Sequence, residues 1–229
     1  MSESWKQRNE AWEARARLLG KRAVLHVGHK TQQQQDEITR KQRDVIFPLL
    51  INAVQKNFSK RLPTRLLDFG CGVGRWSTAL SDVTGCDVLG VDPTEQFLEI
   101  CRSEHRRDDS DHPQVLFAKL VDGKIPTPDE DFDIVWACMV LSTILDVTGG
   151  MYEEILKEIH RVLCPGGLMV LIDNTSGRGG REVRSPYSIS RTVDQYVSTF
   201  AAHEIMIQPV GQYEDLGEIN TIFTGVCIR

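Results

Sequence analysis

Three glycines at alternate positions are prominent among the residues that could bind a ligand. Gly70, Gly72 and Gly74 occur in the stretch RLLDFGCGVGRW, directly after an apolar run that is typical of a buried strand. Glycine weakens a strand interior, so this spacing indicates a tight turn or a close approach between backbone and ligand. We expect the N–H groups of Gly70 and Gly72 to reach such a ligand, with a helix N-terminus near Arg75 facing the same place.

An acidic residue follows at the spacing that a nucleoside ligand requires. Asp92 ends the next predicted strand, DVLGVD, about 20 residues beyond the glycines. At this distance a carboxylate can bind a ribose diol, and the alternative is an N-cap for the helix beginning TEQF. A dinucleotide fingerprint, GxGxxG, would need a small residue at position 75, where this chain has Arg75. The observed pattern is DxGxGxG, which begins at Asp68.

Alternating strands and helices would bring these residues together. The predicted strands RLLDFG, DVLGVD, VLFAKL, FDIVWACMV and LMVLIDN are separated mostly by amphipathic helical segments. This order favours βαβ units and a parallel sheet covered on both faces, with a ligand at the carboxyl ends of the strands. Near the end of the sequence, HEIMIQPV and NTIFTGVCIR have no helix between them, which predicts an antiparallel hairpin at the sheet edge.

The first 60 residues are predicted to be helical. Residues 3–19 place Trp5, Trp12 and Ala16 on one helical face, which needs a partner surface. A second helical region, VIFPLLINAVQKNF, contains Pro48, which would either kink that helix or begin its last section. We therefore expect residues 1–60 to form a helical lid packed on a core of residues 61–229.

Composition restricts the class of protein. A chain of 229 residues with 41% hydrophobic residues can bury the core of one domain. The net charge of -5 does not favour nucleic acid as a partner. Six cysteines without a CxxC pair favour a reducing compartment. With neither an apolar leader nor a membrane-length apolar run, the sequence predicts a cytoplasmic protein.

Four motifs between residues 65 and 174 resemble those of the class I S-adenosylmethionine-dependent methyltransferases. They are LLDFGCGVGR, VLGVDP, VDGKIPTPDEDFDIVWACMVL and EIHRVLCPGGLMVLID, in the order and spacing of that family. The resemblance implies an α/β, Rossmann-like methyltransferase fold with a mostly parallel seven-stranded sheet, an antiparallel C-terminal hairpin strand and an N-terminal helical extension. It also implies S-adenosylmethionine as the cofactor.

The resemblance assigns roles to matched residues. Asp68 would help to hold the amino-acid end of the cofactor, unless it only caps a turn. Asp92 would accept hydrogen bonds from the ribose hydroxyls. Val121, through its N–H, and Asp122, through its side chain, are alternatives for the adenine contact. The full set of implied cofactor-binding residues is Asp68, Gly70, Cys71, Gly72, Asp92, Pro93, Val121, Asp122 and Cys138, the last of which could simply pack.

The catalytic machinery is not identified by the sequence. Many small-molecule relatives carry a His after the fourth strand, where this chain has VLSTIL with Ser142 and Thr143. His26 and His29 lie in a segment expected to fold over the cofactor mouth, and His29 is a substrate-side candidate. Gly28 and the lack of accompanying carboxylates or cysteines argue against a metal site there. No catalytic residue is assigned.

A substrate wall is expected over residues 175–203. Arg178, Arg184, Tyr187 and Arg191 fall within SGRGGREVRSPYSISR, where arginines could bind an anionic acceptor; a solvated loop is the alternative. The leading hypothesis is methyl transfer to a small molecule or glycan end. The alternatives are an RNA or protein methyltransferase, and an inactive cofactor-binding subunit that docks a partner through Trp5 and Trp12. The acceptor, the methylated atom and the oligomeric state stay open.

Overall fold

A computed structural model describes residues 3–25, 30–105, 112–144, 150–176, 182–185, 188–215 and 217–229. Its helices are α1 (Glu3–Leu19), α2 (Gln32–Asn57), α3 (Ser77–Thr84), α4 (Glu95–Glu104), α5 (Gly150–Val162) and α6 (Val193–Ala201), with 3-10 turns η1 (Gly20–Ala23) and η2 (Leu141–Thr143). Its strands are β1 (Arg65–Phe69), β2 (Asp87–Asp92), β3 (Val115–Lys119), β4 (Phe132–Cys138), β5 (Leu163–Asn174), β6 (Glu182–Ser185), β7 (Ser188–Ser190), β8 (Ile205–Asp215) and β9 (Glu218–Cys227).

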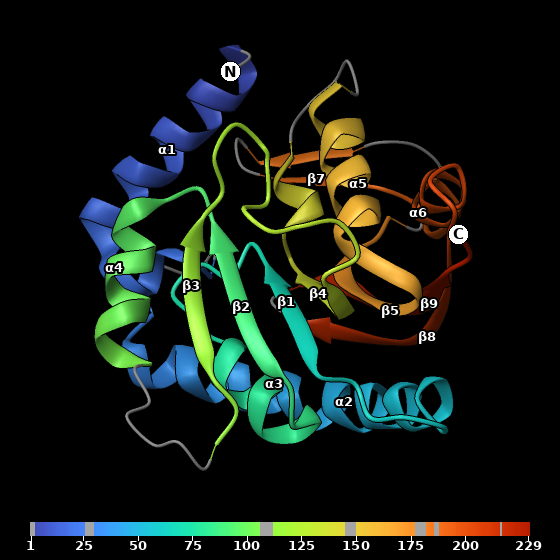
Figure 1. Ribbon diagram of the computed structural model, residues 1–229. Coiled ribbons are helices and arrows are strands. Elements are labelled where there is room, and N and C mark those ends of the chain that lie inside the picture. Colours follow the sequence, from blue (N-terminus) through green and yellow to red (C-terminus); the bar gives the residue numbers. More distant parts are fainter. Residues whose placement is uncertain are drawn as a thin grey trace.

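Seven strands form one sheet in the order β3-β2-β1-β4-β5-β9-β8. Strands β1 to β5 pair in parallel, and β9 pairs antiparallel with both β5 and β8. The predicted fold is therefore confirmed, including the antiparallel hairpin at the edge (Figure 1). In register, Phe69 lies beside Val91 of β2 and Ala137 of β4. The carboxyl ends of β1, β2 and β4 thus meet at one edge of the sheet.

One face of the sheet is covered by α2 and α3. Ile46 and Leu50 of α2 and Leu80 of α3 pack with Trp136 of β4 in one buried cluster, and each is at most 1% exposed. Helix α2 begins with a capping box at Thr31 and runs through Pro48 as one 26-residue element. Because its apolar side covers the sheet, α2 is part of the core layer, whereas α1 lies elsewhere.

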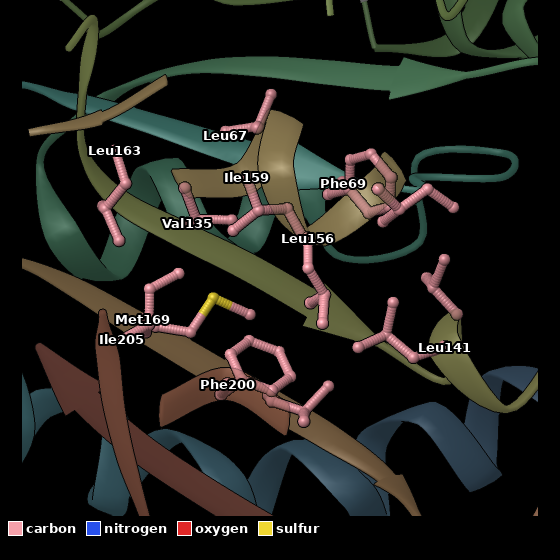
Figure 2. Close-up of a cluster of buried hydrophobic side chains, with 14 of the residues drawn as sticks. Leu67, Phe69, Val135, Leu141, Leu156, Ile159, Leu163, Met169, Phe200 and Ile205 are labelled. Carbon is pink, nitrogen blue, oxygen red and sulfur yellow. The ribbon is translucent and has the colours of Figure 1, made fainter. Parts of the chain in front are cut away.

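The other face of the sheet is covered by α5 and α6. Figure 2 shows the buried cluster there, in which Leu156 and Ile159 of α5 and Phe200 of α6 pack against strand side chains such as Val135 and Met169. Neighbouring residues in a strand point to opposite faces, so Val135 joins this cluster while Trp136 joins the other. The near-continuous apolar sequence of β4 follows from burial on both sides.

Three smaller findings complete the fold. Strands β6 and β7 pair antiparallel in a separate two-stranded sheet, within the segment for which the sequence predicted a substrate wall. All six cysteines are free thiols. Across the described ranges, none of the helices combines the length and the apolar character needed to cross a membrane.

Candidate cofactor site

The glycine-rich loop after β1 adopts a backbone that only glycine adopts readily. Gly70, Gly72 and Gly74 have φ values of 70°, 55° and 74°. A Cβ on Gly70 would lie 2.5 Å from Val140 Cγ2, and one on Gly72 would lie 2.8 Å from Val24 Cγ1. Both the turn and the packing of its neighbours therefore require these glycines.

The hydrogen-bond partners of the loop N–H groups differ from those expected from the sequence. The N–H groups of Gly70 and Cys71 both donate to Val91 O, at 2.8 and 3.0 Å, because pairing with β2 continues past the end of β1. The N–H of Gly72 donates to Asp92 Oδ2 at 3.0 Å. The expectation that the N–H groups of Gly70 and Gly72 face a ligand is wrong for this arrangement.

Asp92 connects the glycine loop to the turn after β2. Besides the bond from Gly72, its Oδ1 accepts the N–H of Thr94 at 2.9 Å. Asp92 is 7% exposed, and burial raises the pKa of its carboxyl against the opposing effects of these N–H groups and of Arg8. The carboxylate therefore lies at the predicted position, beside the loop, and also supports the turn leading into α4.

A pocket opens at this edge of the sheet, with about 770 Å³ of empty space that includes solvent at its mouth. It is formed by α1, the glycine loop, the turn after β2 and the end of β4. Its lining residues are Arg8, Trp12, Val24, Phe69, Gly70, Cys71, Gly72, Arg75, Trp76, Asp92, Pro93, Thr94, Phe97, Leu120, Cys138, Met139, Val140, Thr143 and Ile155. Six of the predicted cofactor residues thus come together: Gly70, Cys71, Gly72, Asp92, Pro93 and Cys138.

Helix α1 contributes to the pocket from the N-terminal end of the chain. Arg8 Nη2 donates to Thr143 Oγ1 at 3.0 Å, which connects α1 to η2. The Trp12 ring packs edge-on against Phe97 of α4, with ring centroids 6.4 Å apart. Glu13 Oε1 accepts the N–H of Glu95 at 3.0 Å, at the start of α4. These contacts place the predicted Trp12 face against α4, next to the pocket. Helices α1 and α4 lie side by side in Figure 1.

Two predicted residues, in the turn after β3, do not line the pocket. Val121 is 56% exposed and pairs with Lys124 in a tight turn, where Asp122 has a φ of 52°. Leu120, which is 5% exposed, lines the pocket instead. The turn leaves Val121 and Asp122 exposed to solvent, and neither of them lines the pocket with Asp92.

The predicted substrate residues are largely outside the described part of the chain. Arg178, Tyr187 and His29 lie outside the described residues, and Arg184 is described only as backbone within β6. Arg191 is 2% exposed and lies in the interior. Its Nη1 and Nη2 donate to the carbonyls of Leu141 and Ile144, at 2.8 and 3.2 Å.

Arg191 also lies with its guanidinium carbon 4.1 Å from the centre of the Tyr152 ring. Together with its bonds to two carbonyls, this contact gives the side chain a role in holding η2 against α5. Arg191 does not line the pocket. The geometry thus supports a positioning role for Arg191 in place of the expected grip on an acceptor.

Several lining residues were missed by the sequence reasoning. Arg8 and Thr94 carried no recognisable pattern, and Arg75 was used only to exclude a dinucleotide fingerprint. Apart from Thr143, the remaining missed residues are apolar or aromatic, such as Trp76, Phe97, Leu120 and Met139. Trp12 had a usable signal, because its helical spacing already indicated a buried face.

Acid–base groups are sparse around the pocket. Among its described lining residues there is no histidine, and burial raises the pKa of the Cys138 thiol to about 12. In the described ranges no group of three His, Cys, Asp or Glu side chains could hold a metal ion. His26 lies outside these ranges, as does His29.

Asp68 is buried behind the glycine loop and does not line the pocket. It is 2% exposed, and its Oδ2 accepts a hydrogen bond from the hydroxyl of Ser77 at 2.6 Å. This contact is closer to the alternative role, in which Asp68 only caps a turn, than to a cofactor contact. Burial raises the pKa of this carboxyl to about 7. The folded protein therefore keeps a proton on Asp68 over a pH range in which the unfolded chain has lost it.

We expect Asp68→Asn to flatten the pH dependence of stability. As the pH rises from about 4 to about 7, the wild type should lose up to roughly 3–4 kcal/mol of unfolding free energy relative to the variant. Urea denaturation of both proteins across pH 4.5 to 8.5 would measure this difference. Parallel stability curves would contradict the raised pKa.

Comparisons with known proteins agree with the geometry. Residues 67–171 match the family model described as "Methyltransferase domain". The chain is 33% identical over 127 residues to a demethylmenaquinone methyltransferase from Staphylococcus aureus strain JH9, covering 53% of this chain and 48% of that protein. The chain thus spans about half the length of the curated relatives it matches.

Solved structures share the fold. Magnesium protoporphyrin IX methyltransferase from Synechocystis PCC 6803, solved with bound S-adenosylhomocysteine, superposes with a TM-score of 0.66 at 15% identity, covering 96% of each chain. Phosphoethanolamine N-methyltransferase 2 from Haemonchus contortus superposes with a TM-score of 0.59 at 16% identity, covering 79% of this chain and 52% of that one. The matching domain model over residues 67–171, the sheet order and the glycine loop together support recognition of this region as a class I S-adenosylmethionine-dependent methyltransferase domain.

Proposed function

We propose that this chain is an S-adenosylmethionine-dependent methyltransferase that acts on a small-molecule acceptor. The observation that carries the proposal is the position of Asp92, whose carboxylate lies beside the left-handed glycine loop in the pocket at the edge of the sheet. The named activity of the Staphylococcus aureus relative and the two methyltransferase structures support it. The small-molecule class rests on these relatives and on the net charge of -5.

The residues of the pocket fit the cofactor. The Asp92 carboxylate would accept hydrogen bonds from the ribose hydroxyls, and Gly70, Cys71 and Gly72 would lie along the methionyl and ribose portions. Leu120, Pro93 and Phe97 offer an apolar surface for the adenine ring, in place of Val121 and Asp122. When bound, the cofactor supplies a methyl group activated by a sulfonium.

The protein's part in such a reaction is to align the acceptor and to exclude water. Helix α1 would serve both tasks, because Arg8 bonds to Thr143 across the pocket and Trp12 packs on Phe97. We therefore propose that α1, rather than the whole of residues 1–60, is the lid. Helix α2 belongs to the core layer on the sheet.

Methyl-labelled S-adenosylmethionine, incubated with the protein and with separated metabolite, RNA and protein fractions, tests the proposal. We expect label to enter the metabolite fraction, and mass spectrometry would identify the methylated compound. Label in RNA or protein would replace the small-molecule acceptor with the rival class. Cofactor binding without transfer to any fraction would instead indicate an inactive cofactor-binding subunit.

A further inference from the structure

Arg75 is a cation in the pocket that makes no salt bridge with a described residue, although the carboxyl groups of Asp68 and Asp215 act on it at longer range. Its Nη1 donates to Gln42 Oε1 at 2.5 Å and to Thr39 Oγ1 at 3.3 Å, and its guanidinium carbon lies 4.5 Å from the centre of the Trp76 ring. The donors at Nε and Nη2 make no hydrogen bond or ion pair with any residue in the described ranges. Removing a charge from water is costly, and burial lowers the pKa of Arg75 against the opposing effects of nearby groups that include Asp68 and Asp215.

Trp76 presents a second unused donor at the same end of the pocket. It is 4% exposed, and its Nε1 has no hydrogen-bond partner in the described part of the chain. The adjacent polar group is the Cys138 thiol, which burial keeps protonated and which is a weak acceptor. Arg75, Trp76 and Cys138 therefore offer donors and no strong acceptor.

The rest of this end of the pocket is apolar. Met139 and Val140 follow Cys138 at the end of β4, and both line the pocket. Asp92 lies at the end of β2, beyond the intervening strand β1. The donors of Arg75 and Trp76 thus lie on the β4 side of the glycine loop and the carboxylate of Asp92 on the β2 side.

We propose that Arg75 binds an ionised oxygen of the acceptor, either a carboxylate or an ionised ring hydroxyl, on an otherwise apolar molecule. This inference rests on the proposed function and names the acceptor class of the same site. The guanidinium supplies the positive charge that such an oxygen needs when it leaves water. Trp76 Nε1 donates a further hydrogen bond to it.

The proposal accounts for the absence of a histidine base among the described lining residues. For O-methylation, the ionised oxygen attacks the methyl carbon; a carbon–oxygen bond forms and the carbon–sulfur bond breaks, with its electron pair going to sulfur. The sulfonium becomes a neutral thioether, and the methylated acceptor is neutral. No proton is removed in this step, because the acceptor has already lost it in solution or in the field of Arg75.

The experiment compares three probes on one ring system: naphthoate, naphthol and naphthylamine. Each is titrated by calorimetry into protein saturated with S-adenosylhomocysteine, for the wild type, Arg75→Gln and Arg75→Lys. Arg40→Gln is the matched control, since Arg40 is an exposed residue on α2 that does not line the pocket. Cofactor affinity is measured separately for each variant.

We expect Arg75→Gln to weaken naphthoate binding by roughly 10- to 100-fold while changing the S-adenosylhomocysteine affinity by less than about twofold. Arg75→Lys should recover part of the loss, because it keeps the charge without the planar fork. Naphthylamine binding should change little in either variant. The hydroxyl pKa of bound naphthol, followed by its fluorescence, should be lower in the wild type than in Arg75→Gln.

Three results would overturn the assignment of Arg75. One is that the wild type binds naphthoate and naphthylamine equally well, or binds neither of them. Another is an equal loss of both probes in Arg75→Gln, which would indicate a structural role. The third is an unchanged naphthoate affinity. A wild type that binds no S-adenosylhomocysteine would instead refute the proposed function itself.

Discussion

Gly70→Ala should destabilise the protein by about 2–5 kcal/mol and greatly weaken cofactor binding. A side chain at φ 70° costs about 1–2 kcal/mol, and overpacking adds about 1–3 kcal/mol, because the new Cβ would lie 2.5 Å from Val140 Cγ2. Either the loop or Val140, which also lines the pocket, must move. Urea denaturation and calorimetry with S-adenosylhomocysteine measure the two effects.

Gly166→Ala is the matched control for the backbone term. Gly166 has a φ of 71°, and a Cβ there would have nothing within 4 Å. This variant should lose only the conformational cost and should keep its cofactor affinity. If Gly70→Ala is as stable as Gly166→Ala, the packing of Val140 against the loop does not require glycine.

Asp92→Ala should weaken S-adenosylhomocysteine binding by about 1.5–3 kcal/mol, roughly 10- to 150-fold in Kd. The variant loses a charged acceptor for the ribose hydroxyls and also the bonds from the N–H groups of Gly72 and Thr94. Asp92→Asn keeps the shape of the side chain, so it should restore the stability of the protein to a greater extent than its affinity for S-adenosylhomocysteine. Calorimetry on folded protein measures the loss.

Asp87→Ala provides the comparison on the same strand. Asp87 begins β2 and accepts the N–H of Gln114 at 2.8 Å, at the end of the strand away from the pocket. Its removal should leave cofactor affinity unchanged. If Asp92→Ala and the wild type bind S-adenosylhomocysteine with equal affinity, Asp92 only supports the turn before α4.

The fold and the centre of the site could be predicted because local rules determine them. Gly70 and Gly72 have a backbone requirement that is independent of distant residues, and Asp92 follows at the end of the adjacent parallel strand. Because strands alternate with helices, the strands run parallel, and their carboxyl ends meet at one edge of the sheet. Trp12 could be placed on a buried face by its spacing alone, although its partner Phe97 could not.

The rest depends on tertiary contacts that the sequence does not display. Val121 and Asp122 were aligned by motif, but a tight turn exposes Val121 and leaves Leu120 at the pocket. Arg191 belonged to a basic stretch, yet two carbonyls from η2 and the residue after it bind its guanidinium. The residues around Arg75 do not predict where its side chain lies, because the guanidinium is held by a hydrogen bond to Gln42 of α2.

The most direct measurement is a calorimetric titration of the wild-type protein with S-adenosylhomocysteine, run in parallel with NAD(H). The account predicts saturable binding of S-adenosylhomocysteine, at one site per chain, and no binding of NAD(H), since Arg75 occupies the position where a dinucleotide fingerprint needs a small residue. Saturable binding of NAD(H) without binding of S-adenosylhomocysteine would contradict it.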